Sequence, residues 1–142
     1  KQVLIPRATI LTPNLPEAAA LLGTRPATSE GEAESQLAAL SRLGAVAVLL
    51  KGGHGAGDTA LDLLWIDGRI VRFEAPRIAT RNTHGTGCTL SSAIAAYLAR
   101  GSGLEQAVKA AKVYVTEAID AGRKLGVGRG NGPVDHLYGI EL

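Results

Sequence analysis

The sequence of 142 residues contains no methionine and only one cysteine, one tryptophan and one phenylalanine. A single cysteine excludes an internal disulfide framework and a zinc site built from several cysteines. Because methionine is absent, we expect that the sequence does not start at a natural initiation codon and that it is a fragment of a longer chain. The alternative is a complete small domain from which a leader or a tag has been removed.

An excess of one charge and long apolar runs are missing as well. Fifteen Lys and Arg residues against 13 Asp and Glu residues give a formal net charge of +2, and aromatic residues make up 4% of the chain. Scattered basic residues with few aromatic side chains disfavour nucleic acid as a partner. No apolar stretch is long enough to span a bilayer, and no signal-peptide pattern is present. We therefore predict a cytoplasmic protein without a membrane partner.

The most informative stretch is a glycine-rich turn over residues 83–89, followed by an alanine-rich run over residues 90–98 with helical periodicity. Closely spaced glycines allow the backbone to approach a ligand. The first N–H groups of a helix point outward at the positive end of its dipole, where phosphate groups bind. Cys88 lies in this first turn, where the dipole favours a thiolate. The stretch therefore predicts the active-site turn of a phosphotransferase.

The first part of the chain predicts a βαβ unit. Residues 8–12 are β-branched and apolar between prolines, which indicates a buried strand. A turn then leads into a helix that continues through residues 18–22, and a capping box at 29–32 opens a second helix over 33–43. The continuous apolar run over 45–50 is typical of a strand that is covered on both faces in a parallel sheet.

The later part of the chain contains four further segments with regular patterns. They are strands over 62–66 and 69–73 and helices over 86–100 and 104–121. Asp67-Gly68 between the two strands is a strong signal for a two-residue hairpin, which would form an edge of the sheet. We expect a loop over residues 74–82, a capping box at 102–105 before the last long helix, and a short helix at the C-terminus.

Polar residues follow two of the predicted strands. Asn14 and Glu17 follow the first strand, and Lys51 and Gly52 end the next one. Open α/β sheets bind ligands at the carboxyl ends of their strands, where a lysine can reach a phosphate and oxygen side chains can hold a cation. The alternatives are an ordinary helix N-terminus formed by Asn14 and Glu17, and a solvent-exposed Lys51. His54 fits a loop histidine better than a metal ligand.

Residues 82–88 (Asn-Thr-His-Gly-Thr-Gly-Cys) resemble the C-terminal signature of the ribokinase-like kinases, Asp-Thr-x-Gly-Ala-Gly-Asp. Residues 12–17 carry the Asn-x-x-Glu motif of that superfamily. The resemblance is closest to the hydroxymethylpyrimidine phosphate kinases of thiamine biosynthesis. Their Thr-Pro-Asn-x-x-Glu-Ala, Lys-Gly-Gly-His, Asn-Thr-His-Gly-Thr-Gly-Cys-Thr-Leu-Ser and Gly-Pro-Val motifs occur here in order, across essentially the whole chain.

This resemblance implies an α/β protein, namely the C-terminal half of a ribokinase-like three-layer α/β/α fold. Its sheet would be mainly parallel, with an antiparallel hairpin at one edge. Residues 1–142 would form a single domain, the nucleotide-binding half of a larger kinase domain. Such kinases are about twice as long, so we expect the chain to associate with the missing N-terminal half or to form a homo-oligomer, and to turn over poorly by itself.

The resemblance also implies roles in the turn. Cys88 stands where most ribokinase-like enzymes carry an aspartate base, and it would accept the proton of the substrate hydroxymethyl group. The backbone N–H groups of Gly85, Thr86 and Gly87 would form the anion hole for the transferring phosphoryl group. His84 would lie near the phosphate or the ring of the pyrimidine substrate.

The cofactors implied by the resemblance are ATP and Mg²⁺. Lys51, Gly52 and Thr83 would lie against the nucleotide phosphates. Asn14 and Glu17 would hold the magnesium ion through water. The pyrimidine substrate and ATP would be the small-molecule partners of the chain, which makes the intact protein a small-molecule kinase.

Two alternatives remain open. Some pyridoxal kinases carry a Gly-x-Gly-Cys turn of the same kind, and the relative rates with pyridoxal and hydroxymethylpyrimidine phosphate would separate them from pyrimidine kinases. The other alternative is a folded, non-catalytic fragment that binds nucleotide weakly or not at all, in which Cys88→Ala would change no measurable property. A redox or acylating cysteine enzyme is disfavoured, because no resolving cysteine exists and the glycine cradle would have no role.

Overall fold

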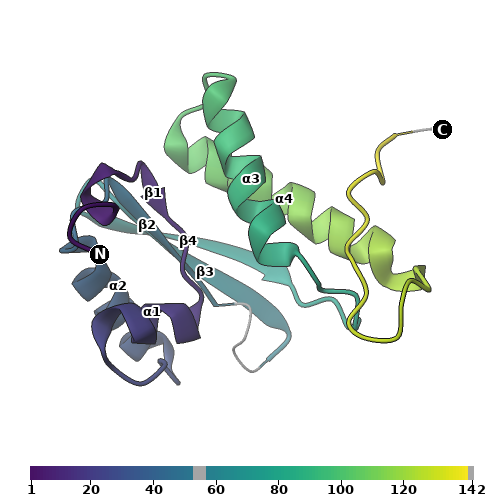
Figure 1. The fold of residues 1–142 in the computed structure, drawn as a ribbon, viewed down its shortest axis with the longest axis horizontal. Coiled ribbons are helices and arrows are strands. Elements are labelled where there is room, and N and C mark those ends of the chain that lie inside the picture. Colours follow the sequence, from purple (N-terminus) through teal and green to yellow (C-terminus); the bar gives the residue numbers. More distant parts are fainter. Residues whose placement is uncertain (53–56, 141–142) are drawn as a thin grey trace. The chain divides into compact units, whose positions relative to one another are not determined.

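The computed structural model describes residues 1–52 and 57–140, so His54 lies outside the described residues. The chain forms two compact units, residues 1–74 (unit 1) and residues 75–142 (unit 2). Unit 1 contains the strands and two helices, and unit 2 contains two long helices and the segments that flank them (Figure 1). The last strand crosses the boundary between the two units.

Unit 1 is built on a mixed four-stranded sheet in the order β1-β2-β3-β4. β1 pairs with β2 in parallel, and β2 pairs with β3 antiparallel. The elements along the chain are the 3-10 helix η1 (Ile5–Arg7), β1 (Ile10–Leu11), α1 (Leu15–Leu22), α2 (Glu30–Ser41), β2 (Ala47–Lys51), β3 (Thr59–Ile66) and β4 (Arg69–Pro76). The predicted βαβ unit and the hairpin are therefore both present, but the sheet of the described residues is mixed rather than mainly parallel, because β3 runs antiparallel to β2.

The strands differ in burial as their sequences do. Residues 47–50 of β2 are fully buried, as their continuous apolar run predicts. β1 is limited to two half-buried residues, whereas a buried strand over 8–12 was predicted. β1 is the first strand in the sheet order, with β2 as its partner in the described sheet, and this edge position explains its greater exposure.

The hairpin between β3 and β4 has the predicted two-residue turn. Asp67 and Gly68 both have positive φ angles, 49° and 76°, as a type I′ turn requires. β4 continues to Pro76, so the loop predicted from residue 74 begins later. Trp65 packs against the core.

The N-terminus of α2 differs from the predicted capping box. Ser29 accepts a hydrogen bond from the N–H of Glu32 at 3.3 Å. The Glu32 carboxylate, however, accepts from the N–H of Thr28 at 2.8 Å and from its hydroxyl at 2.9 Å. These bonds from Thr28 lower the pKa of Glu32. The return bond of the cap is therefore made one residue earlier than the sequence pattern predicts.

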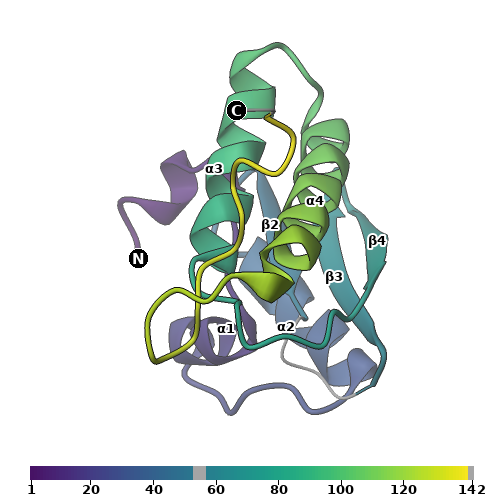
Figure 2. The ribbon, with the colours of Figure 1, turned by 90° about the vertical axis from the view of Figure 1, so that its right-hand side faces the viewer.

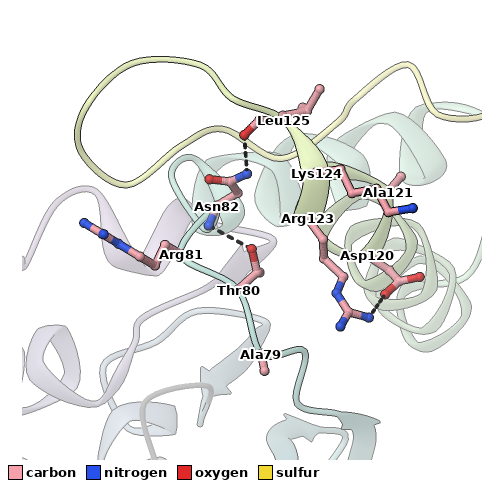
Figure 3. A pocket seen from close by; sticks show the side chains of 9 residues that line it. All are labelled: Ala79, Thr80, Arg81, Asn82, Asp120, Ala121, Arg123, Lys124 and Leu125. Atoms are coloured by element: carbon pink, nitrogen blue, oxygen red, sulfur yellow. Dashed lines mark hydrogen bonds and ion pairs between the residues drawn. The ribbon is translucent and has the colours of Figure 1, made fainter.

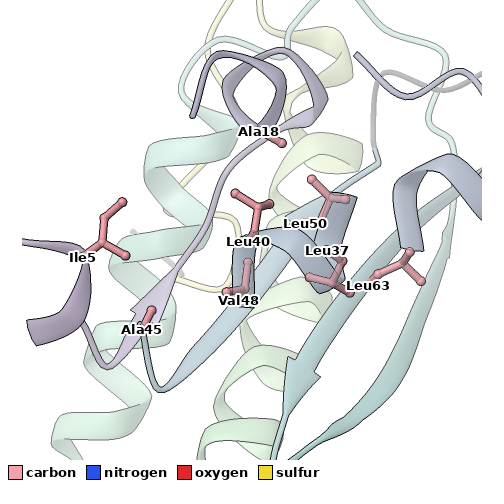
Figure 4. Close-up of a cluster of buried hydrophobic side chains, with 8 residues drawn as sticks. All are labelled: Ile5, Ala18, Leu37, Leu40, Ala45, Val48, Leu50 and Leu63. Carbon is pink, nitrogen blue, oxygen red and sulfur yellow. The ribbon is translucent and has the colours of Figure 1, made fainter. Parts of the chain in front are cut away.

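The core of unit 1 lies between α2 and the sheet (Figure 4). Leu37 and Leu40, three residues apart, place their side chains on one face of α2, and both are completely buried. The buried members of the cluster are Ile5, Ala18, Leu37, Leu40, Ala45, Val48, Leu50 and Leu63. This cluster holds α1 and α2 on β1 and β2, and Asn14 and Lys51 lie at the carboxyl ends of these two strands.

Unit 2 consists mainly of the helix pair α3 (Thr86–Ala99) and α4 (Leu104–Ala121), which pack side by side (Figure 2). The short 3-10 helix η2 (Gly122–Lys124) follows. Both long helices have almost the predicted bounds. The predicted capping box at 102–105 is wrong, because Gly103 is the N-cap and makes no side-chain cap bond. The predicted terminal helix is also wrong, since residues 136–139 form turns.

No helix in residues 1–52 and 57–140 combines the length and the apolar character needed to cross a bilayer.

Candidate functional site

The polar residues predicted at the strand ends of unit 1 lie together. Asn14 and Lys51 form a single parallel bridge just beyond β1, and the N–H of Lys51 donates to the carbonyl of Pro13 at 2.8 Å. The Lys51 Nζ lies 3.9 Å from Oε2 of Glu17. The Lys51 side chain is 17% exposed and that of Glu17 is 58% exposed. The predicted convergence of Asn14, Glu17 and Lys51 is therefore present in unit 1.

Asn14 and Glu17 also have a structural role. The Oδ1 atom of Asn14 accepts from the N–H of Glu17 at 2.8 Å, and Oε2 of Glu17 accepts from the N–H of Asn14 at 2.7 Å. These two bonds form a complete capping box at the start of α1. Within the described residues Oε1 of Glu17 has no protein partner, so one carboxylate oxygen can still face a ligand.

Gly52 occupies a crowded position at the end of β2. Its N–H donates to Oδ1 of Asp62 at 2.9 Å, and a Cβ atom at this position would overlap the carbonyl oxygen of Leu61. Asp62 is 7% exposed and stands opposite Lys51 in the β2–β3 register. Sequence reasoning did not single out Asp62, although an acidic residue in an apolar strand is a signal that could have been used.

The glycine turn of unit 2 begins α3 as predicted. Gly85 is the N-cap with a φ angle of 84°, a left-handed conformation that glycine adopts without a steric cost. The Thr86 hydroxyl donates to the carbonyl of Thr83 at 2.7 Å. The N–H and the hydroxyl of Thr89 both donate to the carbonyl of Gly85 at 2.8 Å. Local hydrogen bonds therefore hold the turn on both sides of Gly85.

Three N–H groups of the turn remain open. The N–H groups of Gly85, Gly87 and Cys88 have no acceptor within residues 1–52 and 57–140, whereas that of Thr86 donates to the carbonyl of Thr83 at 3.3 Å. Unpaired N–H groups at the positive end of a helix bind anions. Cys88 is exposed beside them. The turn therefore combines anion donors with a thiol.

The C-terminal segment, which we define as residues 132–136, lies against this turn. The N–H of His84 donates to the carbonyl of Gly132 at 3.0 Å, and His84 and Pro133 form a single parallel bridge. The Nε2 atom of His136 lies 2.9 Å from Oγ1 of Thr89. The Gly-Pro-Val motif within this segment is visible in the sequence, but nothing in the local pattern predicts the pairing with His84.

A pocket in unit 2 lies between the residues that directly precede the turn and the end of α4 (Figure 3). Its lining residues are Ala79, Thr80, Arg81, Asn82, Asp120, Ala121, Arg123, Lys124 and Leu125. The Asn82 amide donates to the carbonyls of Leu125 at 2.8 Å and of Gly122 at 2.7 Å, which ties residue 82 to the end of α4. Arg123 pairs with Asp120 at 3.0 Å. The pocket is polar and carries an excess of positive charge.

A protein-only metal centre is not found in the described part of the chain, because no three His, Cys, Asp or Glu side chains gather there. The oxygen atoms of Asn14 and Glu17 are of the type that Mg²⁺ prefers, and Mg²⁺ usually keeps several water ligands. Two such side chains fit an ion that is held largely through water and phosphate. They do not fit a dedicated protein cage.

The comparisons with known proteins agree with these motifs. The family model described as phosphomethylpyrimidine kinase matches residues 1–135. The hydroxymethylpyrimidine/phosphomethylpyrimidine kinase of Rhizobium meliloti is 52% identical over 135 residues, which are 95% of this chain and 51% of that protein. The thiamine biosynthesis bifunctional protein ThiED of Geobacter sulfurreducens is 47% identical over 141 residues, 99% of this chain and 28% of that protein.

Among solved structures, an ADP complex of Bacillus subtilis pyridoxal kinase matches with a TM-score of 0.90 and 33% identity, over 96% of this chain and 51% of that chain. The predicted α/β fold of the ribokinase-like kinases is thereby confirmed. The chain spans about half the length of the curated relatives it matches, apart from the longer bifunctional ones.

Proposed function

Since the chain belongs to the phosphomethylpyrimidine kinase family, we propose that it serves the ATP-dependent phosphorylation of 4-amino-5-hydroxymethyl-2-methylpyrimidine and its phosphate in thiamine biosynthesis. The observation that carries this proposal is the set of open N–H groups beside Cys88 at the start of α3. Phosphoryl transfer needs such a cradle because charge spreads over the oxygens of the transferring group.

In the proposed first phosphorylation, that of the hydroxymethylpyrimidine itself, Cys88 acts as the base. Its thiolate takes the proton of the substrate hydroxyl, the hydroxyl oxygen forms the new bond to the γ-phosphorus of ATP, and ADP leaves with the electrons of the broken phosphorus–oxygen bond. In the second phosphorylation, an oxygen of the substrate's own phosphate would attack instead, without a hydroxyl to deprotonate. The predicted anion hole consists of the N–H groups of Gly85, Thr86 and Gly87. The N–H of Thr86 already donates to the carbonyl of Thr83. We therefore assign the N–H of Cys88, which has no acceptor within the described residues, to the anion hole alongside those of Gly85 and Gly87.

The remaining roles follow the family resemblance. Exposed His84 would contact the phosphate or the ring of the pyrimidine, and Thr83 would face the nucleotide. In unit 1, Lys51 would contact the nucleotide phosphates as a point charge, with Gly52 beside it.

Asn14 and Glu17 would hold Mg²⁺ through water, and Oε1 of Glu17, which has no partner within the described residues, would accept a hydrogen bond from one of those water molecules. When bound, the ion neutralises charge on the phosphate oxygens.

The test uses the 142-residue chain in two assays, ADP binding by calorimetry and single-turnover phosphate transfer from labelled ATP. We expect Cys88→Ala to lower transfer by about 100- to 10,000-fold, the range for removal of a general base, while ADP affinity stays within about twofold. Ser92→Ala, on the exposed side of α3 one turn later, is the matched control and should alter neither. Equal transfer by the native chain and Cys88→Ala would contradict the assignment of the base.

We expect slow transfer even by the native chain. Positioning of the reactants provides most of the rate in phosphoryl transfer, and the chain spans about half the length of its curated kinase relatives. Steady multiple turnover at a rate typical of kinases would overturn this expectation.

A second candidate is pyridoxal phosphorylation, which is favoured by the close structural match to Bacillus subtilis pyridoxal kinase. Pyridoxal and hydroxymethylpyrimidine each carry a hydroxymethyl group on a nitrogen heterocycle, so the same base and cradle would serve either one. Parallel transfer assays with pyridoxal and with hydroxymethylpyrimidine separate the two functions. Faster transfer to pyridoxal would favour the second candidate.

A further inference from the structure

A hydrogen-bonded chain links the C-terminal segment (residues 132–136) to the N-cap of α3. The Oγ1 atom of Thr89 lies 2.9 Å from Nε2 of His136 and 2.8 Å from the carbonyl oxygen of Gly85. A threonine hydroxyl has one proton to donate. Because Thr89 gives that proton to Gly85, His136 donates its Nε2–H to Thr89. The sequence of bonds therefore runs from His136 through Thr89 to the carbonyl of Gly85.

His136 is itself held by α4. The hydroxyl of Tyr114 donates to the carbonyl of His136 at 2.9 Å, and the N–H of Asp135 donates to the carbonyl of Ala118 at 2.9 Å. The rings of Tyr114 and Tyr138 lie 5.7 Å apart, which adds a contact between α4 and the residue two positions after His136. The imidazole therefore projects from a backbone that is held at the N–H of Asp135 and at the carbonyl of His136.

A second bond from the same segment reaches the other side of the turn. The N–H of His84 donates to the carbonyl of Gly132 at 3.0 Å. Peptide groups are planar, so a bond at one end of a peptide fixes the direction of the group at its other end. The bond at His84 sets the Thr83–His84 peptide plane, and the bond to the Gly85 carbonyl sets the Gly85–Thr86 plane.

We propose that residues 132–136 form a clamp that positions the glycine turn, and that His136 is its positioning residue, acting through Thr89 on the carbonyl of Gly85. The clamp holds the peptides that flank the open N–H groups and the first turn that carries Cys88. Its effect on phosphoryl transfer rests on the function proposed above, whereas its effect on the geometry of the turn does not.

The test uses the sole thiol as a reporter in the 142-residue chain. The rate of Cys88 alkylation by iodoacetamide is measured beside ADP affinity for His136→Leu, which removes the donor, and His136→Gln, which keeps an N–H donor at a similar reach. We expect His136→Leu to change the alkylation rate and the ADP affinity by about 2- to 10-fold, the range for one lost hydrogen bond. His136→Gln should remain within about twofold of the native chain.

Thr89 provides the second half of the test. Thr89→Val removes the hydroxyl at nearly constant volume and should reproduce the effect of His136→Leu, whereas Thr89→Ser should not. Because both residues act in one chain of bonds, the double variant Thr89→Val/His136→Leu should show no more than the larger single effect. Ser92→Ala is the control on α3, and circular dichroism verifies that each variant is folded.

The outcomes separate the two proposals. An unchanged alkylation rate in His136→Leu, a His136→Gln variant that behaves like His136→Leu, or additive effects in the double variant would each overturn the clamp. The expected alkylation pattern in a chain that fails to bind ADP would support the clamp and overturn nucleotide binding at the turn.

Discussion

The two units hold their candidate functional groups in different ways. In unit 1, Asn14 and Glu17 cap a helix, and Lys51 contacts the Glu17 carboxylate. In unit 2, the N–H groups of Gly85, Gly87 and Cys88 have no acceptor in the described part of the chain, and they come from the backbone rather than from side chains.

This difference determines how strongly the structure of each unit argues for ligand binding. The side chains of Asn14, Glu17 and Lys51 hold one another in place, so their positions would be expected even without a ligand. The turn of unit 2 leaves polar groups open where a helix dipole favours an anion, and its geometry is held from outside by residues 132–136. The structural argument for phosphate binding is therefore stronger in unit 2.

The largest effect on stability should follow the loss of a buried side chain from the core that supports Asn14 and Lys51. Leu37 is completely buried in the core of unit 1, and Leu37→Ala should lower the free energy of unfolding by about 2–5 kcal/mol. Urea denaturation measures the change. Leu4→Ala, at a residue that is 76% exposed, is the matched control and should change stability by less than about 0.5 kcal/mol. Similar losses in both variants would contradict a core centred on α2.

Gly52→Ala tests whether the glycine after Lys51 serves packing. The added Cβ would overlap the Leu61 carbonyl and displace the Gly52 N–H from Asp62, and we expect a loss of about 1–3 kcal/mol, as for overpacked sites. Gly31→Ala, where a Cβ would meet nothing within 4 Å, is the control in unit 1 and should not destabilise. A Gly52→Ala chain of native stability with weakened ADP binding would instead assign Gly52 to the nucleotide.

Asn14→Ala separates the cap from the proposed magnesium role. Loss of the N-cap bond should lower stability by about 1 kcal/mol, while Asn14→Asp keeps an accepting oxygen and should stay close to native. The Mg²⁺ dependence of ADP binding is measured on the same variants. If Asn14→Ala loses stability and keeps its full Mg²⁺ dependence, Asn14 serves the helix alone.

Most of the features that distinguish the two units could be predicted from the sequence, because they depend on residues that are close together in the chain. The bounds of α3 and α4 follow from long helical periodicity with glycines at their ends, and the Asp67-Gly68 turn follows from its φ requirements. The capping box of Asn14 and Glu17 was one of two stated alternatives for these residues. The capping box is present, and the proposed binding of a metal ion by the same two residues stays a prediction.

The features that sequence reasoning missed depend on tertiary contacts. The pairing of His84 with Pro133 joins residues that are far apart in the chain, and no local pattern encodes it. The same holds for the bond between Thr89 and His136. The wrong prediction of a capping box at 102–105 shows that a local pattern can also mislead. Residues 102–105 match the residue types of a capping box, but Gly103 takes the N-cap position and has no side chain to accept a hydrogen bond.

The smallest expected effect concerns Tyr138, two residues beyond the clamp, and is confined to alkaline pH. The Tyr138 hydroxyl donates to the Glu117 carboxylate at 2.6 Å. Burial, followed by this bond, raises the pKa of Tyr138 to about 12. A raised pKa means that the folded state holds the proton more tightly than the unfolded state. The contribution of Tyr138 to stability is therefore complete below about pH 10 and is lost as the pH rises through about 12.

The titration of tyrosine absorbance near 295 nm checks this assignment. We expect Tyr138→Phe to remove the ionisation step near pH 12. Glu117→Gln, which removes the charge but keeps an accepting oxygen, should move that step to lower pH without abolishing it. Because Tyr138 contacts α4 just beyond His136, the alkylation rate of Cys88 at neutral pH should hardly change in Tyr138→Phe. A large change there would mean that Tyr138, and not His136 through Thr89, sets the geometry of the glycine turn.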